Sequence, residues 1–189
     1  MRIVGGRFGG RTLAAPAGAL VRPTSDRVRE AMFNILEHGL PGFAFDGTRV
    51  LDLFAGSGAL GLEALSRGAA FCLFVEEAAE ARASIRRNVE ALGLTGASKI
   101  FRRDATDLGA AAQHGAARLA FLDPPYGRGL AERALRSLAR GGWLAPGAIV
   151  VVEEAKATAL GLPPAYQLLD QRSWGDTQVL FAAFVAACS

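Results

Sequence analysis

The stretch VLDLFAGSGALGLEAL, residues 50–65, decides the fold of this chain. An apolar run leads into the glycine pattern Gly56-x-Gly58-x-x-Gly61, and the residues that follow favour a helix. This order of strand, turn and helix is typical of the site that holds a mononucleotide-bearing cofactor. A tight turn with close helix packing explains Gly61 well, but it explains Gly56 and Gly58 less well. NAD, FAD and S-adenosylmethionine (AdoMet) all fit the pattern, so the turn alone leaves the cofactor open.

Strand and helix patterns alternate along the rest of the chain. The strands are expected at 49–54, 70–75, 98–102, 118–123 and 147–152, with helices near 58–67, 78–92 and 130–140. Nearly continuous apolar strands separated by helical patterns predict a parallel sheet that is covered on both faces. Two further strands, at 166–170 and 177–186, flank a short turn and predict an antiparallel hairpin at the end of the sheet. The expected fold is a doubly wound α/β domain with an N-terminal extension.

The extension has a sequence pattern of its own. Its start contains two Gly-Gly pairs between short apolar pieces, which predicts a small hairpin. The stretch RPTSDRVREAMFNILEHG then predicts a helix that is capped by Thr24 or Ser25 and ends at Gly39. We therefore expect a hairpin and helix extension over residues 1–40, followed by a cofactor-binding domain over residues 41–189.

Composition restricts the class of protein. The 189 residues are enough to bury a sizeable core. No run of uncharged apolar residues reaches the length of about 18 that a membrane-spanning helix needs. The two cysteines, Cys72 and Cys188, predict neither a disulfide framework nor a zinc site and fit a reducing cytosol. We expect a soluble cytoplasmic monomer that binds no metal and no membrane.

The positive charge is concentrated at the start of the chain. The net charge is +3, yet residues 1–30 alone hold six arginines against Asp26 and Glu30, so they carry +4. The planar guanidinium group of arginine suits contacts with phosphates and bases. The favoured interpretation is a nucleic-acid-binding surface that includes Arg7 and Arg11. The alternative is an ordinary solvated face, because genomic base composition can also favour arginine over lysine.

Acidic residues occur where three successive expected strands end. Asp52 lies near the end of the first strand, and Asp104 follows the third, where its side chain can reach a base. Glu76 ends the second strand, twenty residues beyond Gly56, which is the spacing at which a carboxylate meets ribose hydroxyls. Ligands of such sheets bind beyond the carboxyl ends of the strands. Any one of these carboxylates could instead be solvated or cap a helix, but together they predict a nucleoside-containing cofactor.

The tetrapeptide Asp123-Pro124-Pro125-Tyr126 suggests the reacting group. It follows an apolar strand, and its prolines fix φ and remove two backbone donors, so carbonyl groups can point outward. A carboxylate beside an outward carbonyl complements an –NH2 group, and a base stacked on Tyr126 gains about 1–3 kcal/mol. Positioning and electrostatics then favour attack by an exocyclic amine on a methyl sulfonium, with Asp123 available as proton acceptor. The alternative is a plain turn with Tyr126 in the core.

A Gly-x-Gly turn on the first strand combined with DPPY on the fourth resembles the class I AdoMet-dependent amino-methyltransferases. The resemblance implies AdoMet as cofactor and a Rossmann-like, seven-stranded, mostly parallel sheet whose last strand runs antiparallel. NAD becomes the lesser alternative, because no residue pattern offers an acid for hydride transfer. His38 and His114 are both expected to be incidental surface residues.

Further motifs follow one another over nearly the whole chain: RIVGGRFGGRTLAAP, RPTSDRVREAMFNIL, FVEE with IRRN downstream, and WGDTQVLF. In these motifs the chain is similar to the RsmD family, the bacterial methyltransferases of guanine N2 in 16S rRNA. The AdoMet contacts that the resemblance implies are Asp52, Phe54, Gly56, Ser57 and Gly58, with Glu76 on the ribose and Asp104 and Ala105 at the adenine. The residues implied around the target guanine are Asp123, Pro124, Pro125 and Tyr126, and those implied beside the active site or RNA are Arg22, Thr24, Arg29 and Asn34.

One position departs from the family pattern. After FVE, related sequences usually continue with one residue and then Asp-Arg, where this chain has Glu77-Ala78-Ala79. Glu76 itself is preserved, so the departure puts only a local contact at the helix start in doubt.

The leading hypothesis is methyl transfer from AdoMet to guanine N2 of 16S rRNA, in the 30S subunit or its assembly intermediate. Flipping of the target base into the pocket would leave recognition to the surrounding RNA shape. A second hypothesis is N6-adenine methylation of DNA or RNA, because DPPY accepts either amine. A third is a non-catalytic nucleotide- or RNA-binding module with the same fold.

Overall fold

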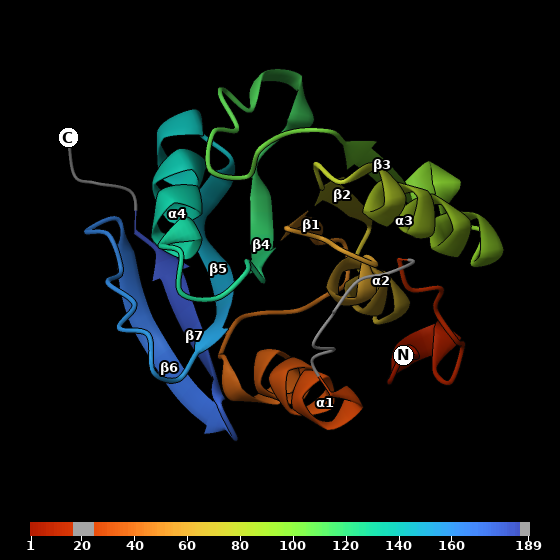
Figure 1. Cartoon of the computed structure of the whole chain (residues 1–189), viewed down its shortest axis with the longest axis horizontal. Helices are drawn as coiled ribbons and strands as arrows, with labels where there is room; N and C mark the ends of the chain where they lie inside the picture. Colours follow the sequence, from red (N-terminus) through yellow and green to blue (C-terminus); the bar gives the residue numbers. More distant parts are fainter. Residues whose placement is uncertain (17–24, 186–189) are drawn as a thin grey trace. The chain divides into compact units, whose positions relative to one another are not determined.

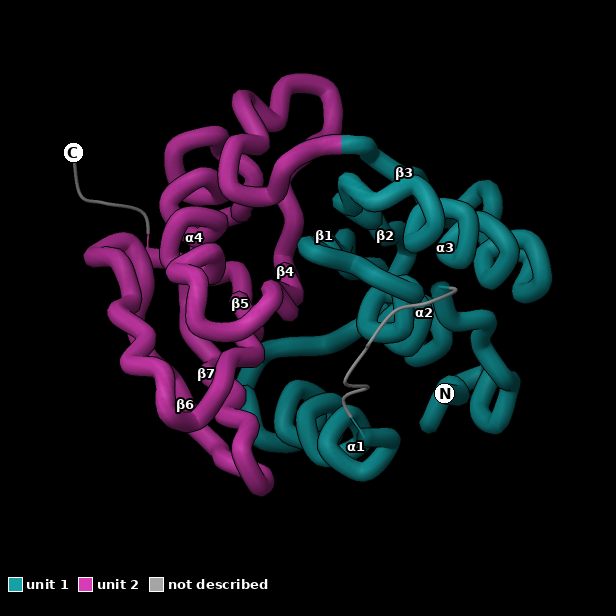
Figure 2. The backbone as a smooth tube through the Cα atoms, in the orientation of Figure 1, with its two compact units in different colours: residues 1–102 teal, residues 103–189 magenta. Residues whose placement is uncertain are grey.

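The computed structural model describes residues 1–16 and 25–185. The chain forms two compact units, Met1–Arg102 and Arg103–Ser189, which Figure 2 shows in separate colours. The N-terminal extension belongs to the first unit together with the first three strands. The expected boundary at residue 40 separates an RNA-contacting extension from a cofactor-binding domain by their functions, and it stays a prediction.

The extension forms a short hairpin followed by a helix. Arg2 and Thr12 make an antiparallel bridge around a 3-10 turn at Gly6–Phe8, so the hairpin is shorter than a pair of full strands. Helix α1 (Asp26–Asn34) begins after Ser25, whose hydroxyl accepts a hydrogen bond of 3.2 Å from the Val28 N–H. Ser25 is therefore a cap, as the sequence predicted. The chain continues from α1 into a π-helical turn, Ile35–Gly39.

Three parallel strands and two helices complete the first unit. The elements are β1 (Arg49–Leu53), α2 (Ala59–Ser66), β2 (Phe71–Val75), α3 (Ala79–Ala91) and β3 (Ser98–Phe101), in the order that Figure 1 shows. Strand β2 pairs with both β1 and β3. Helix α2 packs on β1 and β2, and α3 contacts β3. All four apolar positions after the first residue of β2 are buried, as expected for a strand covered on both faces.

The described residues of the second unit form four strands, one α-helix and a 3-10 turn at Ala112–His114. The strands and the α-helix are β4 (Ala117–Leu122), α4 (Leu130–Gly141), β5 (Leu144–Ala155), β6 (Tyr166–Trp174) and β7 (Thr177–Phe184). Strand β4 is parallel to β5, whereas β7 is antiparallel to both β5 and β6. The predicted terminal hairpin and the antiparallel last strand are therefore confirmed.

The seven strands make the expected α/β fold with a mostly parallel, mixed sheet. The largest differences from the predicted boundaries are in β5, which runs from residue 144 to 155 instead of 147 to 152, and in β6, which extends to Trp174 instead of ending at residue 170. The polar residues Glu153 and Glu154 remain in β5 because Val179 and Gln178 of β7 pair with them. In the two described stretches, no helix combines the length and apolar character that crossing a membrane requires.

Gly61 marks the closest approach between α2 and β2. A Cβ atom added at Gly61 would lie 2.5 Å from both Cys72 Sγ and Phe74 Cε1. Both neighbours are themselves fully buried, so neither has space into which to move. The expectation that the third glycine serves helix packing is therefore supported.

We expect Gly61→Ala to lower the free energy of unfolding by about 1–3 kcal/mol, because the added methyl group overpacks this contact. Gly96→Ala is the matched control: its added Cβ meets nothing within 4 Å. Its effect should stay within about 0.5 kcal/mol. Urea unfolding of both variants measures the difference, and equal stabilities would contradict this account of Gly61.

Candidate functional site

The glycine turn between β1 and α2 is held in a strained backbone conformation. Phe54, Gly56 and Gly58 have φ values of 57°, 55° and 80°. Glycine adopts this left-handed region freely, whereas Phe54 is held there against its own preference. A Cβ on Gly58 would also lie 3.2 Å from Phe74 Cε1. The backbone N–H of Gly58 donates to the Ala55 carbonyl at 2.7 Å, which closes the turn. The predicted cofactor turn is thus compact and preformed.

Asp52 lies under this turn instead of on its surface. Its side chain is 1% exposed, and its Oδ2 accepts a hydrogen bond of 2.9 Å from the Gly61 N–H. Gly58, which precedes α2, has no side chain with which to cap the helix, so Asp52 satisfies one of the free N–H groups there. Burial, with a further contribution from the charge of Glu76, raises the pKa of Asp52 to about 8. Burial therefore favours the protonated form of this carboxyl group.

Glu76 connects the end of β2 to the turn. Its Oε2 accepts from the Gly56 N–H at 2.9 Å, and its Oε1 accepts from the Ala78 N–H at 2.8 Å. A carboxylate oxygen has two lone pairs, so each oxygen can still accept one ribose hydroxyl. The Ala78 contact also satisfies a donor at the start of α3, where the chain departs from the family pattern and no side chain caps the helix.

Asn88 is a functional candidate that the sequence reasoning did not single out. Its Nδ2 donates to the Ser57 carbonyl and to the Ala14 carbonyl at 3.0 Å each, and its Oδ1 accepts from the Ala14 N–H at 2.7 Å. Asn88 therefore joins the N-terminal extension to the cofactor turn. The IRRN motif contains it, but an asparagine within a helix shows no special role until its backbone partners are known.

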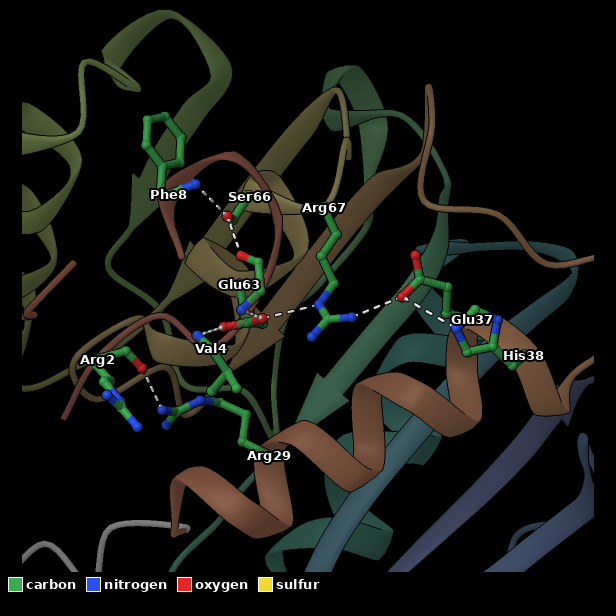
Figure 3. A network of polar contacts seen from close by, with 10 residues as sticks. Arg2, Val4, Phe8, Arg29, Glu37, His38, Glu63, Ser66 and Arg67 are labelled. Atoms are coloured by element: carbon green, nitrogen blue, oxygen red, sulfur yellow. Dashed lines mark hydrogen bonds and ion pairs between the residues drawn. The ribbon is translucent and has the colours of Figure 1, made fainter. Parts of the chain in front are cut away.

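A buried polar cluster on α2 holds the extension in place (Figure 3). The Glu63 carboxylate is fully buried and accepts hydrogen bonds from Val4 N–H at 2.7 Å, Gly5 N–H at 2.8 Å and Arg67 Nε at 2.9 Å. The Ser66 hydroxyl donates to the Gly5 carbonyl at 2.6 Å and accepts from a backbone N–H further along the hairpin. Helix α2 thus carries the cofactor turn at its start and the hairpin at its end.

The hairpin presents two of the predicted RNA contacts to solvent. Arg7 is exposed, and its guanidinium carbon lies 4.5 Å from the centre of the Phe8 ring. Arg11 is exposed beside a cavity of about 290 Å³ that Thr12, Leu13, Asn88, Ala91 and Leu92 also line. Both arginines are therefore placed on a surface from which they can reach a ligand.

The other predicted RNA contacts have different surroundings. Arg29 is only 2% exposed, and its Nη2 donates to the Arg2 carbonyl and, at 2.7 Å, to Asp26 Oδ1. Its visible role is to fasten α1 to the hairpin, and contact with RNA stays a prediction. Asn34 is exposed at the end of α1. Arg22 and Thr24 lie outside the described residues.

In the second unit, Asp104 and Ala105 form a tight turn. Asp104 Oδ1 accepts from both the backbone N–H and the hydroxyl of Thr106, each at 2.8 Å. These bonds, together with the nearby charges of Arg133 and Arg103, lower the pKa of Asp104. The carboxylate therefore stays ionised as an acceptor, while Ala105 is 4% exposed and packs inward.

The DPPY segment, Asp123–Tyr126, follows β4 as a loop. Pro124 is buried, Pro125 is exposed, and the two flanking residues are half-buried. The Tyr126 hydroxyl donates to Glu153 Oε1 at 2.6 Å. Burial and this bond raise the pKa of Tyr126, and the charge of Asp123 adds a smaller effect. Tyr126 is partly exposed and its hydroxyl is hydrogen-bonded to buried residues, and its contact with a base stays a prediction.

Three more residues around this loop were missed by the sequence reasoning. Glu153, Glu154 and Thr177 are nearly completely buried, and each has a polar contact to Tyr126 or Gly127. Two adjacent acids at the end of an apolar strand were a signal that could have been followed. In the parts of the chain that the structure describes, no group of three His, Cys, Asp or Glu side chains could hold a metal ion.

Comparisons with known proteins agree with this architecture. The "Ribosomal RNA small subunit methyltransferase D" of Escherichia coli K12 is 39% identical over 166 residues, which are 87% of this chain and 80% of that relative. A solved structure, "Putative methyltransferase yhhF from Escherichia coli", has a TM-score of 0.83 at 32% identity over 98% of both chains.

A more distant structure, of "a putative methyltransferase complexed with SAH", has a TM-score of 0.62 at 19% identity, over 84% of this chain and 48% of that one; this likeness shows the fold alone. A protein family described as "Conserved hypothetical protein 95" matches residues 1–183. Because that match spans nearly the whole sequence and the Escherichia coli relative is similar over most of its length, the chain belongs to this family, the RsmD family.

Proposed function

We propose that this protein transfers a methyl group from AdoMet to the exocyclic N2 amine of a guanine in 16S rRNA of the small ribosomal subunit, in the cytoplasm. The observation that carries the proposal is the DPPY loop, where Asp123 and a partly exposed Tyr126, hydrogen-bonded at its hydroxyl, follow β4. The rRNA methyltransferase name of the 39% identical relative supports RNA as the substrate class.

The first unit supplies residues that fit AdoMet. The turn from Phe54 to Gly58 brings backbone close to a ligand, and Glu76 has free lone pairs for the ribose hydroxyls. In the second unit, Asp104 is an ionised acceptor suited to the amino group of adenine. When bound, AdoMet supplies an electrophilic methyl group on a positively charged sulfur. The resemblance of the motif order to RsmD proteins supports this donor.

The acceptor chemistry rests on Asp123 and the loop around it. The lone pair of a guanine N2 amine is delocalised into the ring, so it is a weak nucleophile. A carboxylate that accepts one hydrogen of the amine orients the nitrogen and stabilises the positive charge that develops on it. Asp123 can then take the proton that the methylated amine releases. Tyr126 offers its ring face to the base, a contact worth about 1–3 kcal/mol.

Transfer from labelled AdoMet to 30S subunits that lack this modification tests the proposal. Digestion of the product RNA and mass mapping should locate the label in N2-methylguanosine. Label in N6-methyladenosine, or faster transfer to naked duplex DNA than to 30S subunits, would overturn it. Binding of AdoMet without any transfer would instead indicate a non-catalytic module.

We expect Asp123→Ala to lower the transfer rate by about a hundredfold or more, because the developing positive charge loses its carboxylate partner. The Kd for AdoMet should change by no more than about twofold, since Asp123 is assigned to the acceptor and not to the cofactor. Single-turnover transfer and calorimetric titration measure the two quantities. An equal loss of AdoMet affinity would show that Asp123 has been misassigned.

The affinity for AdoMet should depend on pH through Asp52. In the free protein the pKa of Asp52 is about 8, so the carboxyl carries a proton below that pH. The positive charge of AdoMet favours the ionised form, so affinity should rise by up to about tenfold per pH unit below about pH 8 and then level off. Asp52→Asn should bind more weakly and lose this slope, as calorimetry from about pH 6 to about pH 9 would show. Identical slopes in both proteins would contradict the assignment.

Arg7 and Arg11 should contribute to RNA binding by charge. The double variant R7A/R11A should raise the KM for 30S subunits. It should also reduce the slope of log affinity against log salt by about 0.7–0.9 for each phosphate that the protein no longer neutralises. The double variant R136A/R140A, which removes two exposed arginines of α4, is the matched control. A salt slope that is the same in both double variants and in the unaltered protein would assign Arg7 and Arg11 to an ordinary solvated surface.

A further inference from the structure

The Tyr126 hydroxyl is held from two sides within the second unit. It donates to Glu153 Oε1 on β5 at 2.6 Å and lies 3.2 Å from Thr177 Oγ1 at the start of β7. Glu153 is 4% exposed and Thr177 is 8% exposed, so water does not compete freely for these bonds. A short bond to a buried carboxylate is of the strong, charge-assisted kind.

The direction of each bond follows from counting protons. A phenol has one hydroxyl hydrogen, and the Tyr126 hydrogen is directed at the Glu153 carboxylate. The contact with Thr177 therefore uses the threonine hydroxyl as donor and the Tyr126 oxygen as acceptor. These two bonds fix the far end of the ring, which leaves the ring little freedom to rotate away.

The backbone after Tyr126 is held by the neighbouring acid. Glu154 Oε1 accepts from the Gly127 N–H at 3.1 Å and from the Ala155 N–H at 2.8 Å. Gln178 Nε2 donates to the Ala155 carbonyl at 2.9 Å, which connects β7 to the same end of β5. The end of the DPPY loop is thus fastened by side chains from two strands that follow it in the sequence.

The register between β5 and β7 places these contacts. Gly175 has a φ of 58°, and it lets β6 reverse directly into β7. In the separate pairing of β7 with β5, Thr177 lies opposite Ala155 and Val179 lies opposite Glu153. A shift of one residue would turn Thr177 to the other face of the sheet. The WGDTQ motif therefore has a structural role, which is separate from the predicted cofactor and RNA contacts.

We propose that Glu153 and Thr177 are positioning residues that hold the Tyr126 ring in the orientation in which it stacks on the target base. The inference rests on the proposed function, because it needs Tyr126 to face an acceptor base. A ring that is already ordered loses less freedom when the base arrives. Glu153 touches neither base nor cofactor in this assignment, and it acts through the tyrosine hydroxyl.

We call the hydrogen bonds of the Tyr126 hydroxyl with Glu153 and Thr177 the anchor. Kinetics on 30S subunits test it. E153A and Y126F should each lower kcat/KM for the RNA by about tenfold, the range expected for loss of a hydrogen bond to a charged group. The double variant E153A/Y126F should be no worse than either single variant, because both remove the same bond. E153Q should recover most of the activity, since its amide oxygen can accept the same bond. The Kd for AdoMet should stay within about twofold throughout.

Y166F is the matched control. The Tyr166 hydroxyl donates to the Leu135 carbonyl at 2.7 Å, so this variant also loses a buried phenol hydrogen bond in the second unit. It should lower the melting temperature without changing kcat/KM. The proposal would be overturned if E153A kept full activity or if the losses in kcat/KM multiplied in the double variant. Equal losses in kcat/KM for E153Q and E153A would also overturn it. Should E153A not fold, T177V and T177S test the same anchor through its other partner, with loss expected only for T177V.

A second measurement separates failure of this inference from failure of the proposed function. The chain has two tyrosines, so ring signals in a tyrosine-labelled sample are assigned directly with Y126F. Three-bond couplings in this sample report the χ1 rotamer of Tyr126. A single rotamer in the unaltered protein that becomes averaged in E153A would confirm the anchor even if the unaltered protein methylated no guanine. Normal methylation with an averaged χ1 rotamer in the unaltered protein would overturn the anchor and leave the proposed function intact.

Discussion

The buried carboxylate of Glu63 organises the first unit. A charged group that is fully removed from water needs partners for its lone pairs, and Glu63 obtains them from two hairpin N–H groups and from Arg67. The hairpin donors have no strand partner of their own at this point, so the interaction satisfies both sides. Glu63 lies on α2, so the arginine-bearing hairpin is attached to the same helix that follows the predicted cofactor turn.

A similar use of buried acids shapes the second unit. Glu153 and Glu154 occupy the end of β5, where β7 pairs with them and shields them from water. Their remaining acceptor capacity is directed at the loop that follows β4. In both units, therefore, a buried carboxylate on a regular element fixes an irregular segment that carries the predicted chemistry. This arrangement gives loops the precision that catalytic sites need.

Asp52 is both a predicted cofactor contact and a residue that stabilises the fold. Its carboxyl completes the hydrogen bonding at the start of α2 while lying under the strained turn at Phe54. Removal from water makes its charged form costly, so its protonation becomes sensitive to a charged ligand nearby. Asp52 therefore stabilises the folded turn, and its protonation would respond to a charged ligand bound at that turn.

The sequence alone determined the fold class, the order of strands and helices, and the positions of the glycine turn and the DPPY loop. These features depend on local periods and spacings, which are visible in a linear sequence. The packing role of Gly61 was also predictable, because a helix that follows such a turn must approach its sheet closely. Boundaries were within two residues except at β5 and β6, where pairing with β7 keeps polar residues in the strands.

Only the tertiary structure decided which polar residues serve the fold and which face a ligand. Arg29 looked like its exposed neighbour arginines, yet it is buried against the hairpin carbonyl of Arg2. Asn88 and Glu63 gave no local signal, because their hairpin partners are separated from them by 74 and 59 residues along the chain. A hydrogen bond over such a separation depends on where two elements meet in space, and no spacing within either element records it.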